Sequence, residues 1–175
     1  MHEQIDYCER KKIRTIDIKG ENMRELLKWV SIINRYNTNY IDRKLADIGI
    51  NNSQYFYVLH ICNNPGITQD TIFEKILVNP SNITRALANL EKEGFITREP
   101  GVKDKRTWHL YPTEKSLECY DEILKITNGY VEELLSSFEK EEQELFMSML
   151  KKVAFLAIDM NEEAKLEAKE NGRKI

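Results

Sequence analysis

Apolar residues recur at three- and four-residue spacing along most of the chain, a period typical of amphipathic helices. The first such stretch, residues 20–48, carries two apolar stripes that together cover more than half of the helix surface. We therefore expect this helix to be buried between two bodies. Similar stripes predict three shorter helices between residues 53 and 93, and two long helices after Pro112 with a break near residue 137.

The residues at the ends of these stretches support this division. Ser53, Thr68 and Thr113 can each cap the helix that follows, because their hydroxyl oxygens can accept a hydrogen bond from a free backbone N–H. Asn79-Pro80 is typical of a helix start, since proline lacks only an N–H that has no partner there. Gly94 is typical of a helix end.

The period changes after Gly94 and predicts a β-hairpin. Residues 95–98 and 107–111 form short strands, and residues 99–105 form the turn between them. The fold class is therefore mainly α with a small β-hairpin wing. Two helices followed by a wing make a winged helix-turn-helix domain over residues 53–112.

The flanking regions complete the predicted organisation. Helices over residues 20–48 and 113–160 have more apolar surface than one small core can bury, so we expect them to pair with a second copy in a two-fold homodimer. Residues 1–19 are polar and predicted to be an arm. Residues 161–175 are charged and predicted to be a frayed or exposed tail.

The outer face of the predicted helix at residues 79–93 is polar, and several of its side chains are small. It carries small polar residues near its start and, further along, an amide and two basic side chains: Ser81, Asn82, Arg85, Asn89 and Lys92. Asn and Arg match the hydrogen-bonding edges of adenine and guanine in the major groove of DNA. An ordinary surface helix can show the same polar face, so this pattern alone does not establish DNA binding.

The predicted hairpin tip is basic. Lys103, Lys105 and Arg106 surround Asp104, which can accept hydrogen bonds within the loop and hold its shape. Lysines can neutralise phosphates, and a guanidinium can enter the narrow, negative minor groove. A solubilising turn is the alternative interpretation of the tip alone. Helix and hairpin together favour double-stranded DNA as the partner.

The distribution of charge agrees with this interpretation. The chain of 175 residues has a net charge of −3, but residues 79–115 carry seven basic and five acidic side chains, while residues 132–170 carry five and eleven. An acidic protein with a basic edge turns that edge toward a polyanion.

The central segment resembles the winged helix-turn-helix of the MarR family (multiple antibiotic resistance regulators). The resemblance extends over roughly residues 21–160. The motifs that carry it are Pro65-Gly66-Ile67-Thr68-Gln69, Asn79-Pro80-Ser81-Asn82-Ile83-Thr84-Arg85, Leu90-Glu91-Lys92-Glu93-Gly94-Phe95-Ile96, Asp104-Lys105-Arg106 and Leu110-Tyr111-Pro112-Thr113-Glu114-Lys115.

The resemblance implies a homodimeric, ligand- or redox-responsive transcription regulator, most often a repressor, that binds pseudo-palindromic DNA. On matching positions, Ser81, Asn82 and Arg85 would face the major groove, Arg106 would enter the minor groove and Asp104 would steady the wing. Thr84 lies within the same motif and is included in the DNA-binding set. The family's effector cavity would fall near four aromatic residues that suit an apolar or phenolic ligand: Tyr36, Tyr40, Tyr55 and Phe56.

Other function classes find less support in the sequence. It shows no glycine-rich phosphate loop, nucleophile elbow or metal-ligand spacing, so we expect neither an enzyme nor a cofactor. It has no apolar run near the ~20 residues of a membrane span, which favours a cytoplasmic protein. Cys8 lies near basic residues that could lower its pKa, which is typical of a redox sensor, but a thiol without a role is the favoured interpretation. The alternative function is a winged-helix module that binds another protein through its acidic C-terminal half.

Overall fold

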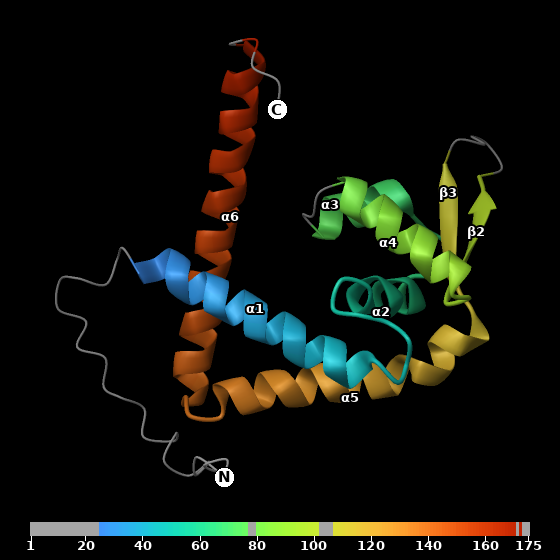
Figure 1. Ribbon diagram of the computed structural model, residues 1–175, viewed down its shortest axis with the longest axis horizontal. Helices are drawn as coiled ribbons and strands as arrows, with labels where there is room; N and C mark the ends of the chain where they lie inside the picture. Colours follow the sequence, from blue (N-terminus) through green and yellow to red (C-terminus); the bar gives the residue numbers. More distant parts are fainter. Residues whose placement is uncertain (1–24, 77–79, 102–106, 171, 173–175) are drawn as a thin grey trace, which may run out of the picture. The chain divides into compact units, whose positions relative to one another are not determined.

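The structure is a computed structural model that describes residues 25–76, 80–101, 107–170 and 172 (Figure 1). The side chains of residues 73–76, 80, 81, 169 and 170 lie outside this description. The chain divides into two compact units, Met1–Tyr120 and Asp121–Ile175. The first unit contains every position that the sequence predicts to contact DNA.

The first unit has the element order of a helix-turn-helix followed by a wing. In chain order it contains helices α1 (Leu26–Leu45) and α2 (Tyr55–Asn63), strand β1 (Ile67–Thr68), helices α3 (Gln69–Ile76) and α4 (Pro80–Lys92), and strands β2 (Ile96–Pro100) and β3 (Trp108–Pro112). Helix α5 (Glu114–Leu135) begins in this unit. The mainly helical fold with a small wing is confirmed.

The wing is part of a three-stranded antiparallel sheet with the order β1-β3-β2. Leu110 at the centre of β3 lies opposite both Ile67 of β1 and Arg98 of β2. The sequence predicts the β2–β3 hairpin but not β1. Two residues are too few to show the alternation by which a strand is detected, and β1 is defined instead by its pairing with a distant segment.

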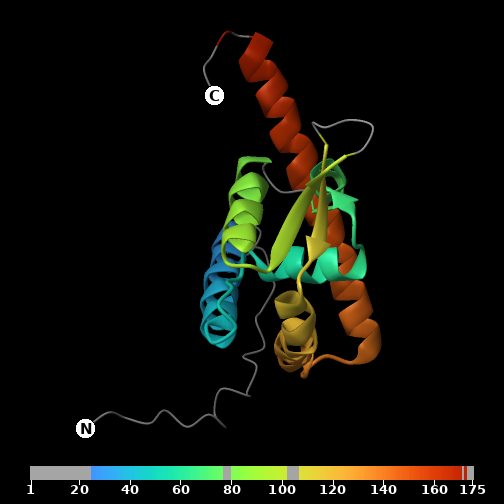
Figure 2. The ribbon, with the colours of Figure 1, turned by 90° about the vertical axis from the view of Figure 1, so that its right-hand side faces the viewer.

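The core of the first unit joins α4 to the sheet. Ile83, Leu87 and Leu90 of α4 have no exposed surface, and neither do Phe95 and Leu110. Figure 2 shows α4 next to the hairpin, and β2 contacts it directly. Burial of each such side chain stabilises the fold by roughly 1.5–3 kcal/mol, so one face of α4 is fixed and the opposite face remains available.

Two of the predicted helix caps are confirmed. The Thr68 hydroxyl accepts a hydrogen bond from the Thr71 N–H at 3.2 Å, and the Thr113 hydroxyl accepts one from the Ser116 N–H at 3.4 Å. The prediction for Ser53 is wrong. Its hydroxyl donates to the side chain of Asn51 at 2.7 Å, and α2 begins later, at Tyr55, without a side-chain cap.

The second unit contains the rest of α5 and the helix α6 (Lys140–Glu170). Gln143 stabilises the corner between them, because its side-chain amide donates to the carbonyls of Leu135 at 3.2 Å and Phe138 at 3.0 Å. Within the described residues, none of the helices combines the length and apolar character needed to cross a membrane.

Helix α6 continues to Glu170, through most of the stretch expected to be frayed or exposed, and residues 161–168 are helical and mostly exposed. The cause is local: this part of the chain is rich in Ala, Glu, Lys and Leu, which are strong helix formers. Lys165 also pairs with Glu162 at 2.6 Å, one helical turn earlier.

Candidate nucleic-acid interface

The candidate interface starts from α4, which has one buried and one exposed face. Ile83, Ala86, Leu87 and Leu90 pack inward. Their three- and four-residue spacing leaves the remaining positions facing solvent. Because the buried face is held by the core, the direction of the exposed side chains is set by the fold.

Four of the predicted DNA-binding residues lie on the exposed face of α4: Asn82, Thr84, Arg85 and Asn89. Thr84 is also held from α3, because the side-chain amide of Gln69 donates to its hydroxyl at 3.1 Å. The side chain of Ser81 lies outside the described residues.

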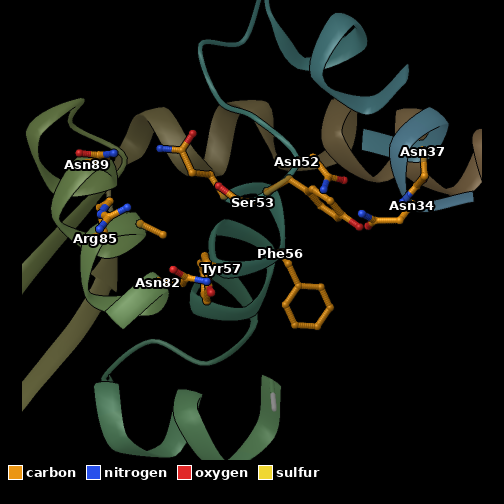
Figure 3. Close-up of a pocket in the computed structure, with 12 residues that line it drawn as sticks. Asn34, Asn37, Asn52, Ser53, Phe56, Tyr57, Asn82, Arg85 and Asn89 are labelled. Carbon is orange, nitrogen blue, oxygen red and sulfur yellow. The ribbon is translucent and has the colours of Figure 1, made fainter. Parts of the chain in front are cut away.

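Three of these residues also line a groove. Asn82, Arg85 and Asn89 form one wall of a depression of about 800 Å³ (Figure 3). The other wall comes from α1, from the segment before α2 and from the first turn of α2. Its members are Asn34, Asn37, Asn52, Ser53, Gln54, Tyr55, Phe56 and Tyr57, and Ala86 completes the lining.

The segment between α1 and α2 is held in place by hydrogen bonds. The backbone N–H of Asn52 donates to the Asp42 carboxylate at 2.7 Å, and the Asn52 side chain donates to Thr38 at 3.4 Å. These contacts hold Asn52, one of the lining residues, in place relative to α1. The groove therefore combines three segments that are far apart in the sequence.

Most residues that line the groove carry a polar group, and aromatic and other apolar atoms make up a comparable share of its surface. Among these described lining residues, Arg85 is the single charged side chain, and the others with polar groups are mostly amides and hydroxyls. A site with a guanidinium and without a carboxylate favours anionic groups such as a phosphate or a carboxylate. Sequence analysis identified the α4 wall but not Asn34, Asn37, Asn52 and Ser53, because single polar residues on a helix surface or in a turn have no distinctive spacing.

The four predicted effector residues are not brought together. Tyr55 and Phe56 line the groove, whereas Tyr36 and Tyr40 are exposed on α1 and are not among the lining residues. Each of those two tyrosines has a cation near its ring, from Arg35 at 5.0 Å and from Lys44 at 5.7 Å. Burial raises the pKa of Tyr55, so its phenol stays protonated.

The base of the wing lies next to α4, and its tip falls outside the described residues. The Gly101 N–H donates to the Thr107 carbonyl at 2.8 Å, which closes the hairpin below the tip. The predicted contacts Lys103, Asp104, Lys105 and Arg106 lie beyond this point and outside the described residues.

An ion pair that sequence analysis missed joins the wing to α4. The Arg98 Nε on β2 lies 3.0 Å from the Glu91 carboxylate on α4, and the Arg98 side chain is 16% exposed. The Nε–H does not point at the carboxylate as a hydrogen bond requires, so the attraction is mainly between charges. This pair couples the position of the wing to that of α4.

The cysteines and histidines that the structure describes give no sign of a metal site. Among the described residues, no group of three or more His, Cys, Asp and Glu side chains could hold a metal ion. His60 stacks on the Phe56 ring, with 6.2 Å between ring centroids. Burial and, to a lesser extent, nearby Cys119 raise the pKa of Cys62 to about 11, so this thiol is protonated at neutral pH. Cys8 lies outside the described residues.

Comparison with known proteins identifies the domain. The model of the MarR family matches residues 50–108, which run from the segment before α2 to the start of β3. YybA of Bacillus subtilis, an uncharacterized HTH-type transcriptional regulator, is 31% identical over 131 residues, which cover 75% of this chain and 87% of YybA. The regulator HosA of Escherichia coli is 30% identical over 100 residues, covering 57% of this chain and 74% of HosA.

Solved structures agree with the sequence comparison. A crystal structure of MarR is 32% identical, with a TM-score of 0.64, and the match covers 79% of this chain and 94% of that one. A MarR-family regulator from Listeria monocytogenes, solved in complex with a 26-mer DNA, is 25% identical with a TM-score of 0.72, covering 86% and 97%. These relatives are transcriptional regulators rather than enzymes, and this chain belongs to the MarR family of DNA-binding transcription regulators.

Proposed function

We propose that the protein is a repressor that binds pseudo-palindromic operators as a homodimer, with α4 in the major groove. The observation that carries this proposal is the division of α4. Ile83, Leu87 and Leu90 have no exposed surface, while Asn82, Arg85 and Asn89 are exposed along the opposite face. Amide and guanidinium groups held in this way suit direct contact with base edges.

The wing would contact the same duplex. Arg106 is proposed to enter the minor groove, with Lys103 and Lys105 on phosphates and Asp104 holding the loop. The ion pair between Glu91 and Arg98 supports a wing that is held next to α4 rather than free of it. A regulator of this kind acts in the compartment that holds its DNA, and we propose that this is the cytoplasm.

The apolar surface of the long helices supports the homodimer. Leu27 of α1 is 76% exposed, and on α6 Leu145, Leu156 and Met160 are 57%, 61% and 69% exposed. A monomer in water rarely leaves so many large apolar side chains in contact with solvent. A second copy of the chain would cover them, and two-fold pairing is the commonest arrangement.

A small effector would bind in the groove beside α4. Tyr55 and Phe56 can contact an apolar or phenolic ring, while Arg85 and the asparagines can bind its polar substituents. The ligand would change the spacing of the two α4 helices of the dimer, which must lie about 34 Å apart to reach successive major grooves.

Selection from a random pool of DNA duplexes tests the proposed function. The expected result is a motif of two inverted half-sites, bound with a salt-dependent affinity in the nanomolar range that is typical of specific DNA binding. A pool that shows no enrichment at low salt would contradict specific recognition and would favour the protein-interaction module instead. The acidic C-terminal half would then be the surface to examine with candidate protein partners.

A further inference from the structure

The turn that follows α4 presents three consecutive backbone carbonyls to the start of α5. The Lys115 ammonium donates to the carbonyl of Glu93 at 2.8 Å, and the Thr113 hydroxyl lies 2.7 Å from the carbonyl of Gly94 and 3.0 Å from that of Phe95. The Phe95 carbonyl also accepts from the Thr113 N–H at 3.1 Å and from the Ser116 hydroxyl. We call this set of contacts the α4–α5 junction.

These bonds hold the turn that directly follows α4. Carbonyls in the last turn of α4 are bound from the same turn, because the backbone N–H groups of Glu93 and Phe95 donate to the carbonyls of Asn89 at 2.9 Å and Leu90 at 2.8 Å. A lysine at this end also interacts favourably with the helix dipole. The Lys115 ammonium lies 3.9 Å from the centroid of the Phe95 ring, and Phe95 is completely buried. The lysine is therefore held by a carbonyl and by an aromatic ring at the same time.

The junction also defines where α5 begins. The Thr113 hydroxyl accepts from the Ser116 N–H at 3.4 Å, and the Thr113 carbonyl accepts from the Leu117 N–H at 3.2 Å. Thr113 thus caps α5 while it binds the turn that ends α4. Because one residue both caps α5 and binds the turn after α4, the angle between α4 and the first turn of α5 is constrained.

We propose that the α4–α5 junction sets the half-site spacing that the dimer accepts, and that Lys115 is the positioning residue. This proposal rests on the proposed function, a homodimer that places two α4 helices on one operator. If α5 is fixed within the dimer, the angle at the junction determines how far each α4 lies from the two-fold axis. Lys115 does not touch DNA in this scheme; it acts through the carbonyl of Glu93.

Lys115 is suited to a test because it is exposed, so its replacement leaves the core intact. Lys115→Met keeps the aliphatic chain and removes the charge and the donors, whereas Lys115→Arg retains both. Lys125→Met is the matched control, since Lys125 is an exposed lysine on the same helix. Thr113→Val is a second test variant, because it removes the hydroxyl that binds the Gly94 carbonyl.

The experiment measures affinity for duplexes that carry two copies of the half-site selected by the wild type. The centre-to-centre separation is varied one base pair at a time, and thermal unfolding is recorded for every variant. We expect wild-type affinity to fall roughly tenfold for a change of one base pair, because the second half-site then moves along and around the helix axis. For Lys115→Met and Thr113→Val we expect a loss of less than about threefold, as a freer α4 follows the displaced site.

A purely structural cap would lower thermal stability without altering the spacing profile. A steep, wild-type profile in both Lys115→Met and Thr113→Val would therefore overturn the proposal. Restoration of the steep profile in Lys115→Arg, with Lys125→Met resembling the wild type, would support it. If the wild type binds none of the duplexes, the proposed function is overturned as well. If the wild type has a steep spacing profile and every variant shares it, only the role of the junction is overturned.

Discussion

At the scale of single residues, the orientation of Arg85 carries the largest functional consequence. It is exposed on α4, it lies one position before the buried Ala86, and it supplies the charge of the groove. Its planar guanidinium can make two parallel hydrogen bonds to one guanine, which a lysine ammonium cannot reproduce. We therefore expect recognition of the operator to require arginine at this position, and not merely a positive charge.

The exchange Arg85→Lys tests this difference. We expect the variant to retain most of its affinity for random DNA and to lose about 1–3 kcal/mol of discrimination between the selected operator and a scrambled duplex. Fluorescence anisotropy on both duplexes measures the two quantities. Lys92→Arg, which changes the cation at the C-terminal end of α4, should keep the discrimination. Equal weakening on both duplexes would instead identify Arg85 as a phosphate contact.

A second prediction concerns Cys62 and alkaline pH. Burial raises the pKa of this thiol from 9.0 to about 11, so above pH 9 the unfolded chain releases the proton while the folded protein keeps it. The unfolded state then binds fewer protons, and the free energy of unfolding falls as pH rises through this interval. Urea unfolding at several pH values from about 8 to about 11 should show a smaller fall for Cys62→Ala than for the wild type.

Cys119→Ala is the control for this measurement, because Cys119 makes the smaller contribution to the shift. It should reduce the alkaline loss less than Cys62→Ala does. Identical pH dependence in Cys62→Ala and the wild type would mean that the thiol keeps its ordinary pKa in the folded protein.

At the scale of elements, the end of α4 depends on a glycine conformation. Gly94 has a φ of +76°, and no atom lies within 4 Å of the position that a Cβ would occupy. A side chain here meets no steric clash with its surroundings, so its cost is the backbone conformation alone. A substitution at Gly94 therefore measures the cost of the backbone conformation without a contribution from side-chain packing.

Gly94→Ala should lower the free energy of unfolding by about 1–2 kcal/mol, the cost of the left-handed conformation for a residue with a Cβ. Gly129→Ala is the matched comparison, because Gly129 lies within α5 and its added Cβ would also meet nothing within 4 Å. This second substitution should raise stability by roughly 0.5–1 kcal/mol. Urea unfolding of both variants checks the opposite signs, and a loss in both would contradict the conformational explanation.

Sequence analysis was most successful where one element carries its own signal. The stripe of Ile83, Leu87 and Leu90 predicts the buried face of α4, and Gly94 predicts its end. Strand β1 was missed because its two residues are defined by pairing with β3. The groove was missed for a similar reason, since it exists only when Asn34, Asn52 and Asn82 are brought together by folding.

At the scale of the whole molecule, the proposed dimer depends on the apolar surface of the long helices. Leu156 of α6 is 61% exposed, and the free chain gains from covering it. An operator with two half-sites requires two reading helices, so assembly is also a condition for tight specific binding. Loss of the dimer is therefore predicted to lower the affinity for DNA as well as the molecular mass.

Replacement of Leu156 by Asp should shift the protein from dimer to monomer, because a charge would have to be buried at the interface. Size-exclusion chromatography with light scattering measures the mass, and anisotropy on the selected operator should show weaker binding. Lys152→Asp is the control, since it places the same residue on the same exposed helix in place of a side chain that is already charged. A dimeric mass for Leu156→Asp would remove this part of α6 from the interface.

The groove shares Asn82, Arg85 and Asn89 with the face of α4 proposed to read DNA. In evolutionary terms these positions are pleiotropic. A substitution selected at Arg85 for a new operator also remakes one wall of the cavity in which an inducer would bind. Gene duplicates of this protein could not alter the two specificities separately at that position, whereas lining residues outside α4, such as Asn34 and Asn37, could change the inducer alone.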